Sequence, residues 1–89
     1  MQTRYLREYD TVRVRCLKLP NRPYDGTESV KRAPEIGDIA AIVHEYLAGD
    51  PAAPVAVEMV DQDGMTVWLA DFHRDELEFV ERPNWAAED

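Results

Sequence analysis

Apolar residues recur at every second position in several short stretches of this chain, which is the pattern of half-buried β-strands. In the first stretch Val12, Val14 and Cys16 alternate with polar and basic residues. The pattern predicts five strands, at residues 11–17, 39–46, 55–60, 65–70 and 77–80. Because these strands are short and closely spaced, with tight turns between them, they predict a small β-barrel.

The turns and the breaks in alternation add detail to three of these strands. Residues 61–64 read Asp-Gln-Asp-Gly and predict a tight hairpin, because an Asp-Gly pair supplies the positive φ that such a turn requires. Ile42 and Val43 are adjacent apolar residues, which interrupts the alternation of the second strand and predicts a bulge or a bend. For the last strand the pattern leaves open whether Leu77 or Glu78 begins the inward face.

The fourth strand carries apolar residues on both of its faces. Its aliphatic residues Met65, Val67 and Leu69 are expected to face the core, which places Trp68 on the opposite face, partly covered or exposed. Residues 71–76 are too few for a stable helix and predict a single 3₁₀ turn before the last strand. The expected fold is therefore an all-β, five-stranded SH3-like barrel with a long first loop.

Residues 18–35 form that first loop, which contains three prolines and one glycine. It exceeds the usual limit of about 12 to 15 residues for a connection without secondary structure, so it is expected to be either functional or flexible. It is the first candidate for the functional surface. The remaining boundaries are an N-terminal arm at 1–10, either a short helical turn or frayed, the barrel at 11–81 and a flexible C-terminal tail at 82–89.

The charge of the chain limits the class of partner. Lys and Arg number 10 against 18 Asp and Glu, a net charge of −8, which repels nucleic acid and anionic membranes and attracts a basic partner. Residues 1–32 carry eight basic and four acidic side chains, whereas 33–89 carry two basic and fourteen acidic ones. The contrast indicates either intrachain pairing between neighbouring strands, which is favoured, or a dipolar surface that orients a partner.

Little in the chain points to catalysis or to a metal. Cys16 is the only cysteine, so no intrachain disulfide forms, and its register predicts a buried, inert thiol. His44 and His73 lack the spacing of metal ligands, and no metal or cofactor is expected. The carboxylates of 71–81 are expected to form a solvated acidic face rather than an acid–base pair. The first twenty residues lack an apolar signal sequence and no stretch could span a membrane, so a cytoplasmic location is expected.

Two resemblances support the barrel. The segments GDIAAIVHEY, VEMVDQDGMTVWLA and DEL, within residues 37–80, resemble the DUF4926-like family of small bacterial SH3-like barrels. More weakly, TVRVR, IAAIVHEY and FHRDELEFV resemble the variable chain of ferredoxin-thioredoxin reductase, a non-catalytic partner of an iron–sulfur subunit. Either resemblance implies a barrel that acts as a partner to another protein. The aromatic grooves with which signalling SH3 domains bind proline-rich peptides are not evident.

The expected function is a non-enzymatic binding module for another bacterial protein with a basic surface. One version is an immunity or antitoxin role, and the alternative is an accessory subunit of a redox or hydratase-type enzyme. Nucleic-acid binding would require a basic stripe, which only the first strand and its loop offer, and a homodimer could form by edge pairing. The expected contact residues are Tyr24, Trp68, Asp71, Phe72, Asp75 and Glu76, with core packing an equally open alternative for Phe72.

Overall fold

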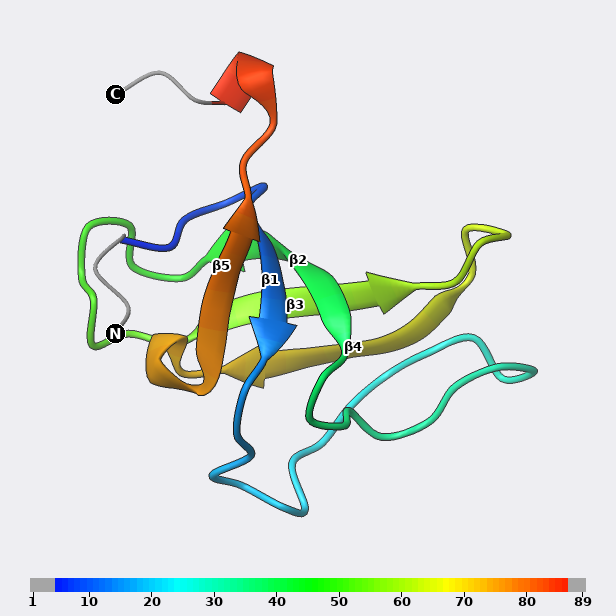
Figure 1. Cartoon of the computed structure of the whole chain (residues 1–89). Coiled ribbons are helices and arrows are strands. Elements are labelled where there is room, and N and C mark those ends of the chain that lie inside the picture. Colours follow the sequence, from blue (N-terminus) through cyan, green and yellow to red (C-terminus); the bar gives the residue numbers. More distant parts are fainter. Residues whose placement is uncertain (1–4, 87–89) are drawn as a thin grey trace.

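The computed structural model describes residues 5–86 and consists of one antiparallel sheet with two short 3₁₀ turns (Figure 1). The strands are β1 (Thr11–Val14), β2 (Ile39–Glu45), β3 (Val55–Val60), β4 (Thr66–Phe72) and β5 (Leu77–Glu81). The 3₁₀ turns are η1 (Arg74–Glu76) and η2 (Asn84–Ala86). The strand order is β4-β3-β2-β1-β5, with every neighbouring pair antiparallel. The predicted all-β class and the 3₁₀ turn before the last strand are confirmed.

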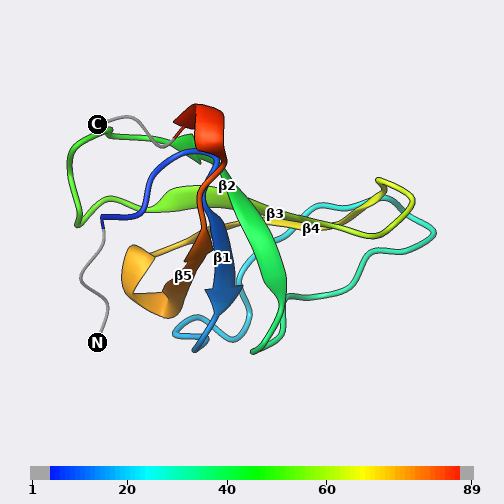
Figure 2. The same cartoon turned by 45° about the horizontal axis from the view of Figure 1, so that its top comes forward.

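The sheet is strongly bent, and β2 carries it from one half to the other. Figures 1 and 2 show β1 and β5 lying across the direction of β3 and β4, while β2 pairs with both β1 and β3. The register of β2 against β3 shifts between Ile42 and His44, so Val43 is an extra residue. The predicted bulge is confirmed, and it lies where the strand turns from one half of the barrel to the other.

The core lies inside this bend and is built from all five strands. Residue Leu77 is fully buried, which settles the open choice for the last strand: the inward face begins at Leu77 and not at Glu78. Leu6 is also fully buried, so the predicted N-terminal arm is neither helical nor frayed at this point. The buried apolar cluster consists of Leu6, Val12, Val14, Ala40, Ile42, Val55, Val57, Val67, Trp68, Ala70, Phe72 and Leu77.

The expected facing of β4 is wrong. Trp68 and Phe72 are 0% and 1% exposed, and Ala70 is also buried, so these residues supply the core face. By contrast, Met65 precedes the strand and is exposed, and Leu69 is half-buried on the outer face. The indole Nε1 of the buried tryptophan donates a hydrogen bond to Asp38 Oδ2 at 2.9 Å, which satisfies its one polar group.

A second bulge explains this reversal. Met59 of β3 pairs with Trp68, but Val60 pairs with Thr66, so Val67 is an extra residue in β4. A bulge advances the alternation by one position, and every side chain after it therefore changes face. Val67 itself is also buried, so Val67 and Trp68, which are consecutive at the bulge, both belong to the core.

The two ends of the described chain meet near the top of Figure 1. Arg82 binds the buried carboxylate of Asp10 through Nε and a terminal nitrogen, at 2.5 and 2.8 Å. The ring of Trp85 in η2 lies 4.8 Å from that of Tyr9, measured between centroids. Residues 1–4 of the predicted arm and 87–89 of the predicted tail lie outside the described residues.

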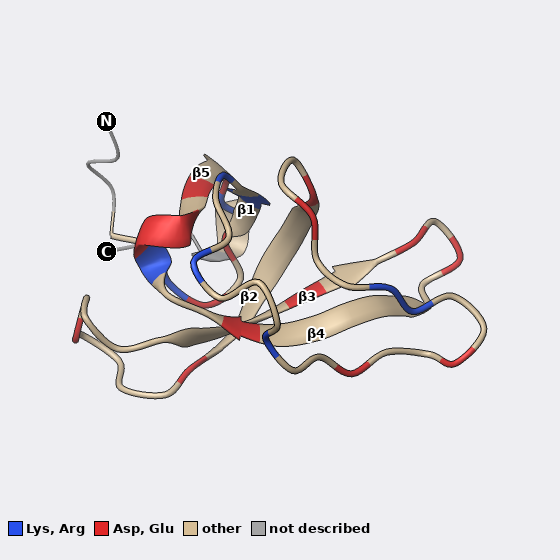
Figure 3. Ribbon diagram, turned by 90° about the horizontal axis from the view of Figure 1, so that it is seen from below, with Lys and Arg blue, Asp and Glu red and all other residues tan. Residues whose placement is uncertain are grey.

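Figure 3 shows basic and acidic residues along the ribbon, and ion pairs join the basic first part of the chain to the acidic second part. Cross-strand pairing of opposite charges, favoured from the sequence, is present between Arg13 of β1 and Glu78 of β5, which lie opposite each other. The other arginine and lysine pairs across this divide include Lys18–Asp75, Arg22–Glu76, Arg32–Glu35, Arg32–Asp38 and Arg82–Asp10.

Candidate functional site

The long loop of residues 18–35 is held along the outer edge of β4. Asp25 and Leu69 exchange two backbone hydrogen bonds, at 3.0 and 2.8 Å, in an isolated β-bridge. The amide of Arg32 donates to the carbonyl of Val67 at 3.1 Å. Because these bonds occupy the groups that an edge strand would otherwise offer, the loop covers this edge of the sheet and takes a defined position beside it.

A buried ion pair anchors the beginning of the loop. Arg22 donates to both carboxylate oxygens of Glu76, and its NH1 also donates to the carbonyl of Asp71 at 2.7 Å. The guanidinium carbon lies 3.9 Å from the centroid of the Phe72 ring, a cation–π contact. Both charged side chains are almost completely buried, so the pair fixes the loop to the end of β4 and to η1.

Glu76 is held in its ionised form by this arrangement. Besides Arg22, it accepts hydrogen bonds from the backbone amides of Lys18 and His73, at 2.7 and 2.9 Å. Burial alone would raise the pKa of this carboxyl, but the hydrogen bond and charge of Arg22, with the two amides, outweigh burial and lower its pKa. The residue is thus part of the scaffold.

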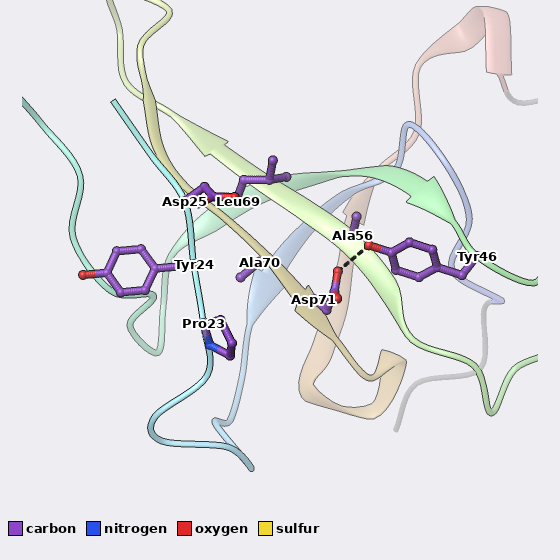
Figure 4. A pocket seen from close by; sticks show the side chains of 8 residues that line it. All are labelled: Pro23, Tyr24, Asp25, Tyr46, Ala56, Leu69, Ala70 and Asp71. Carbon is purple, nitrogen blue, oxygen red and sulfur yellow. Dashed lines mark hydrogen bonds between the residues drawn. The ribbon is translucent and has the colours of Figure 1, made fainter. Parts of the chain in front are cut away.

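A hollow of about 300 Å³ opens on the outer face of β3 and β4, between this loop and the residue after β2. We call it the tyrosine hollow; it is lined by Pro23, Tyr24, Asp25, Tyr46, Ala56, Leu69, Ala70 and Asp71. In Figure 4, Pro23 and Tyr24 lie on one side of the floor and Tyr46 on the other. The two tyrosines are 37% and 49% exposed. The hollow therefore has Tyr46 beside a floor made of strand residues, while the Tyr24 ring on the loop side points away from Asp71.

Tyr46 and Asp71 are linked across the hollow. The Tyr46 hydroxyl points at Asp71 and donates to its Oδ1 at 2.6 Å (Figure 4). The hydrogen bond and the negative charge of Asp71, together with slight burial, raise the pKa of the phenol above its ordinary value of 10.0. The tyrosine therefore stays protonated at neutral pH and orients the carboxylate.

The carboxylates at the hollow lack cationic partners within residues 5–86. Asp25 and Asp71 form no ion pair there, and Glu58, on the same outer face opposite Leu69, accepts only the Thr66 hydroxyl at 2.5 Å. The two cations nearest in sequence are already engaged: Arg22 binds Glu76, and Lys31 Nζ lies 2.8 Å from Glu28. The rim of the hollow therefore carries negative charge that no ion pair within residues 5–86 neutralises, and only Lys31 among the nearby cations interacts with it, through the charge of Asp25.

Comparison with known proteins adds no relative. No family model, curated protein or solved structure matches the chain. The resemblances to the DUF4926-like barrels and to the reductase variable chain therefore stay predictions.

The structure brings together two of the six residues expected at the contact surface. Tyr24 and Asp71 both line the tyrosine hollow. Asp75 is exposed, but it is on η1, where Lys18 pairs with it; the hydrogen bond of that lysine lowers the pKa of Asp75. Glu76 is buried against Arg22, which contradicts its expected place on a solvated acidic face.

Trp68 and Phe72 lie inside the core, so the expectation that they stand at the surface is wrong. Their rings pack together with centroids 5.4 Å apart. The exposure predicted for Trp68 depended on the alternation of β4, which the bulge reverses. The contact surface expected from the sequence did not include Tyr46; its place at the end of the predicted second strand, 39–46, was the available signal.

The groups lining the hollow are phenols and carboxylates; no Cys, His or Ser lines it. Within residues 5–86 no group of three or more His, Cys, Asp or Glu side chains could hold a metal ion. Cys16 is half-buried and not fully buried as predicted, with Sγ 3.9 Å from the carbonyl of Asp75. No helix among the described residues is long and apolar enough to cross a membrane. What the hollow offers chemically is recognition by aromatic surface and negative charge.

Proposed function

We propose that this chain is a non-enzymatic protein-interaction module whose contact surface is the tyrosine hollow. One observation carries the proposal: two half-exposed tyrosines, Tyr24 and Tyr46, line a hollow on β3 and β4 together with two carboxylates that form no ion pair within residues 5–86. Aromatic anchors placed around a preformed depression are the usual energetic centre of a protein interface.

The scaffold around the hollow is suited to binding because it is fixed in advance. The backbone bonds to Leu69 and the buried Arg22–Glu76 pair hold the loop against β4 before any partner arrives. A preformed surface loses little conformational entropy on association, so more of the contact energy appears as affinity. The net charge of −8 would in addition speed encounter with a basic protein and orient it.

The proposal is tested by capturing partners from a lysate of the native host on the immobilised chain and on two variants. Tyr46→Ala removes one wall of the hollow, and the control Trp85→Ala removes a still more exposed aromatic ring, on η2. We expect quantitative mass spectrometry to find a stoichiometric protein that Tyr46→Ala retains at least about tenfold less well and Trp85→Ala retains fully. Recovery of no stoichiometric protein, or equal recovery by all three chains, would contradict the proposal.

A further inference from the structure

We infer that the tyrosine hollow receives a cationic side chain, arginine or lysine, projecting from the partner. This inference rests on the proposed function and names the chemistry of the group that the hollow binds.

Most of the arginines and lysines within residues 5–86 form ion pairs elsewhere in the chain. The pairs of Arg13, Lys18, Arg22 and Arg32 neutralise carboxylates of the scaffold rather than ones at the hollow. Asp25 and Asp71 line the hollow, Glu58 lies on the same outer face, and none of the three forms an ion pair within residues 5–86. Carboxylates gathered on one face favour binding of an opposite charge that reduces their repulsion.

The shape of the hollow fits a long side chain with an apolar stem and a charged end. Ala56 and Leu69 provide an apolar floor, so the methylene groups of arginine or lysine can be buried there. At the end of the floor, Tyr46 holds Asp71 through Oδ1, and Oδ2 has no donor among the described residues. That oxygen is placed to accept a hydrogen bond from a guanidinium or an ammonium group, and charge-assisted bonds of this kind are the strong ones.

The rims add a second attraction for a cation. Aromatic faces attract positive charge through their quadrupole, which gives a gain at exposed sites that a neutral side chain does not obtain. Tyr46 stands beside Asp71, whereas Tyr24 lies on the loop side with its ring directed away from Asp71 (Figure 4), so Tyr46 supplies the aromatic surface next to the carboxylate. An acidic ligand would instead meet three carboxylates without compensation, so the hollow selects by sign of charge.

The test uses short peptides that differ in charge at one position. The probes are N-acetyl-Gly-Gly-X-Gly-Gly-amide with X as arginine, citrulline, lysine or acetyl-lysine, titrated to about 10 mM into the ¹⁵N-labelled chain, a range in which a millimolar complex saturates. We expect saturable chemical-shift changes of the Leu69 and Asp71 amides with the cationic peptides only. Whichever of the arginine and lysine peptides binds more tightly identifies the residue that the partner inserts. We also expect Asp71→Asn to weaken binding about threefold or more, whereas the exposed control Glu81→Gln has no effect.

Two kinds of outcome overturn the inference. Equal binding of the neutral peptides, no saturable shift with either cation, or an affinity unchanged by Asp71→Asn each contradicts it. The captured partner separates this failure from failure of the proposed function. If Tyr46→Ala loses that partner but the double variant Asp25→Asn/Asp71→Asn retains it, the hollow is a protein-interaction surface, but it does not bind a cationic side chain.

Discussion

At the scale of single residues, buried arginines hold this small barrel together. Arg74 is almost completely buried on η1, and all of its five N–H groups have acceptors. They come from the N-terminal segment, from the end of β2 and from the connection between β2 and β3. The acceptors are Leu6 O, Asp50 O, Ala53 O, the Tyr5 hydroxyl and Glu45 Oε1, at 2.8 to 3.0 Å. A single guanidinium thus joins three segments that have no strand pairing with one another.

Replacing Arg74 by lysine keeps the charge but removes the planar fork. An ammonium group has three donors and cannot reach all five acceptors, so buried carbonyls lose their partners. We expect Arg74→Lys to lower the free energy of unfolding by about 2 kcal/mol, measured by urea denaturation. The control is Arg13→Lys in the exposed pair with Glu78, for which we expect a change within about 0.5 kcal/mol. Equal effects of the two substitutions would contradict the role given to Arg74.

At the scale of elements, the strands were predictable from the sequence but the facing of β4 was not. The bulge in β2 follows from the adjacent pair Ile42 and Val43, because consecutive apolar residues break the alternation. In β4 both Val67 and Trp68 are apolar, so the alternation reads equally well in either phase. Only the register against β3 selects one phase, and register depends on contacts distant in sequence.

The docking of the long loop was also beyond sequence reasoning, because backbone atoms make most of its bonds to β4. Its composition of prolines and polar residues indicates a loop, and carries no information on which edge it covers. The loop was named as a candidate surface, and its residues Pro23 to Asp25 line the hollow. Tyr24 and Asp71, both expected at the contact surface, line this one hollow, whereas the choice of Trp68 followed the wrong phase of β4.

Gly26 tests whether the loop must lie against β4. A Cβ at this position would lie 2.6 Å from Lys31 Cβ and 2.8 Å from the carbonyl oxygen of Val67, so the backbone would have to shift. We expect Gly26→Ala to loosen the loop and to speed hydrogen exchange of the Leu69 amide, which donates to Asp25, by about tenfold. Ser29→Ala, at an exposed position of the same loop, is the control and should leave this exchange unchanged. An unchanged rate in Gly26→Ala would show that the loop does not depend on this close contact.

At the scale of the whole molecule, most arginines and lysines within residues 5–86 stabilise the fold through internal ion pairs, and the carboxylates in excess lie at the surface. Two of the paired carboxyls, Asp38 and Glu76, are buried and have lowered pKa values: burial acts to raise them, but the hydrogen bonds of Arg32 and of Arg22 outweigh it. A carboxyl with a lowered pKa in the folded state binds fewer protons there than in the unfolded chain. Its stabilisation is therefore complete above the unfolded pKa and is lost as the pH falls through the folded one.

We accordingly expect acid to destabilise the fold. The urea midpoint should be constant near neutral pH and should fall as the pH drops below about 4.5, the ordinary value for a glutamate. Glu76→Gln leaves Arg22 buried without its counter-charge, so it should lose about 3 kcal/mol at pH 7 and show a shallower further decline in acid. Glu81→Gln should follow the original chain at every pH. A midpoint independent of pH down to about 2 would contradict the scaffold role of these pairs.

The most direct measurement of the central claim is amide hydrogen exchange of the chain with and without its captured partner. A partner seated in the tyrosine hollow should slow exchange at Tyr24 and Asp25, at Tyr46 and at 69–71, where the hollow is lined. Residues of β1 and β5, on the other half of the barrel, should exchange as in the free chain. Protection confined to β1 and β5, with residues 24–25 and 69–71 unchanged, would show that the partner binds elsewhere and that the hollow is not the contact surface.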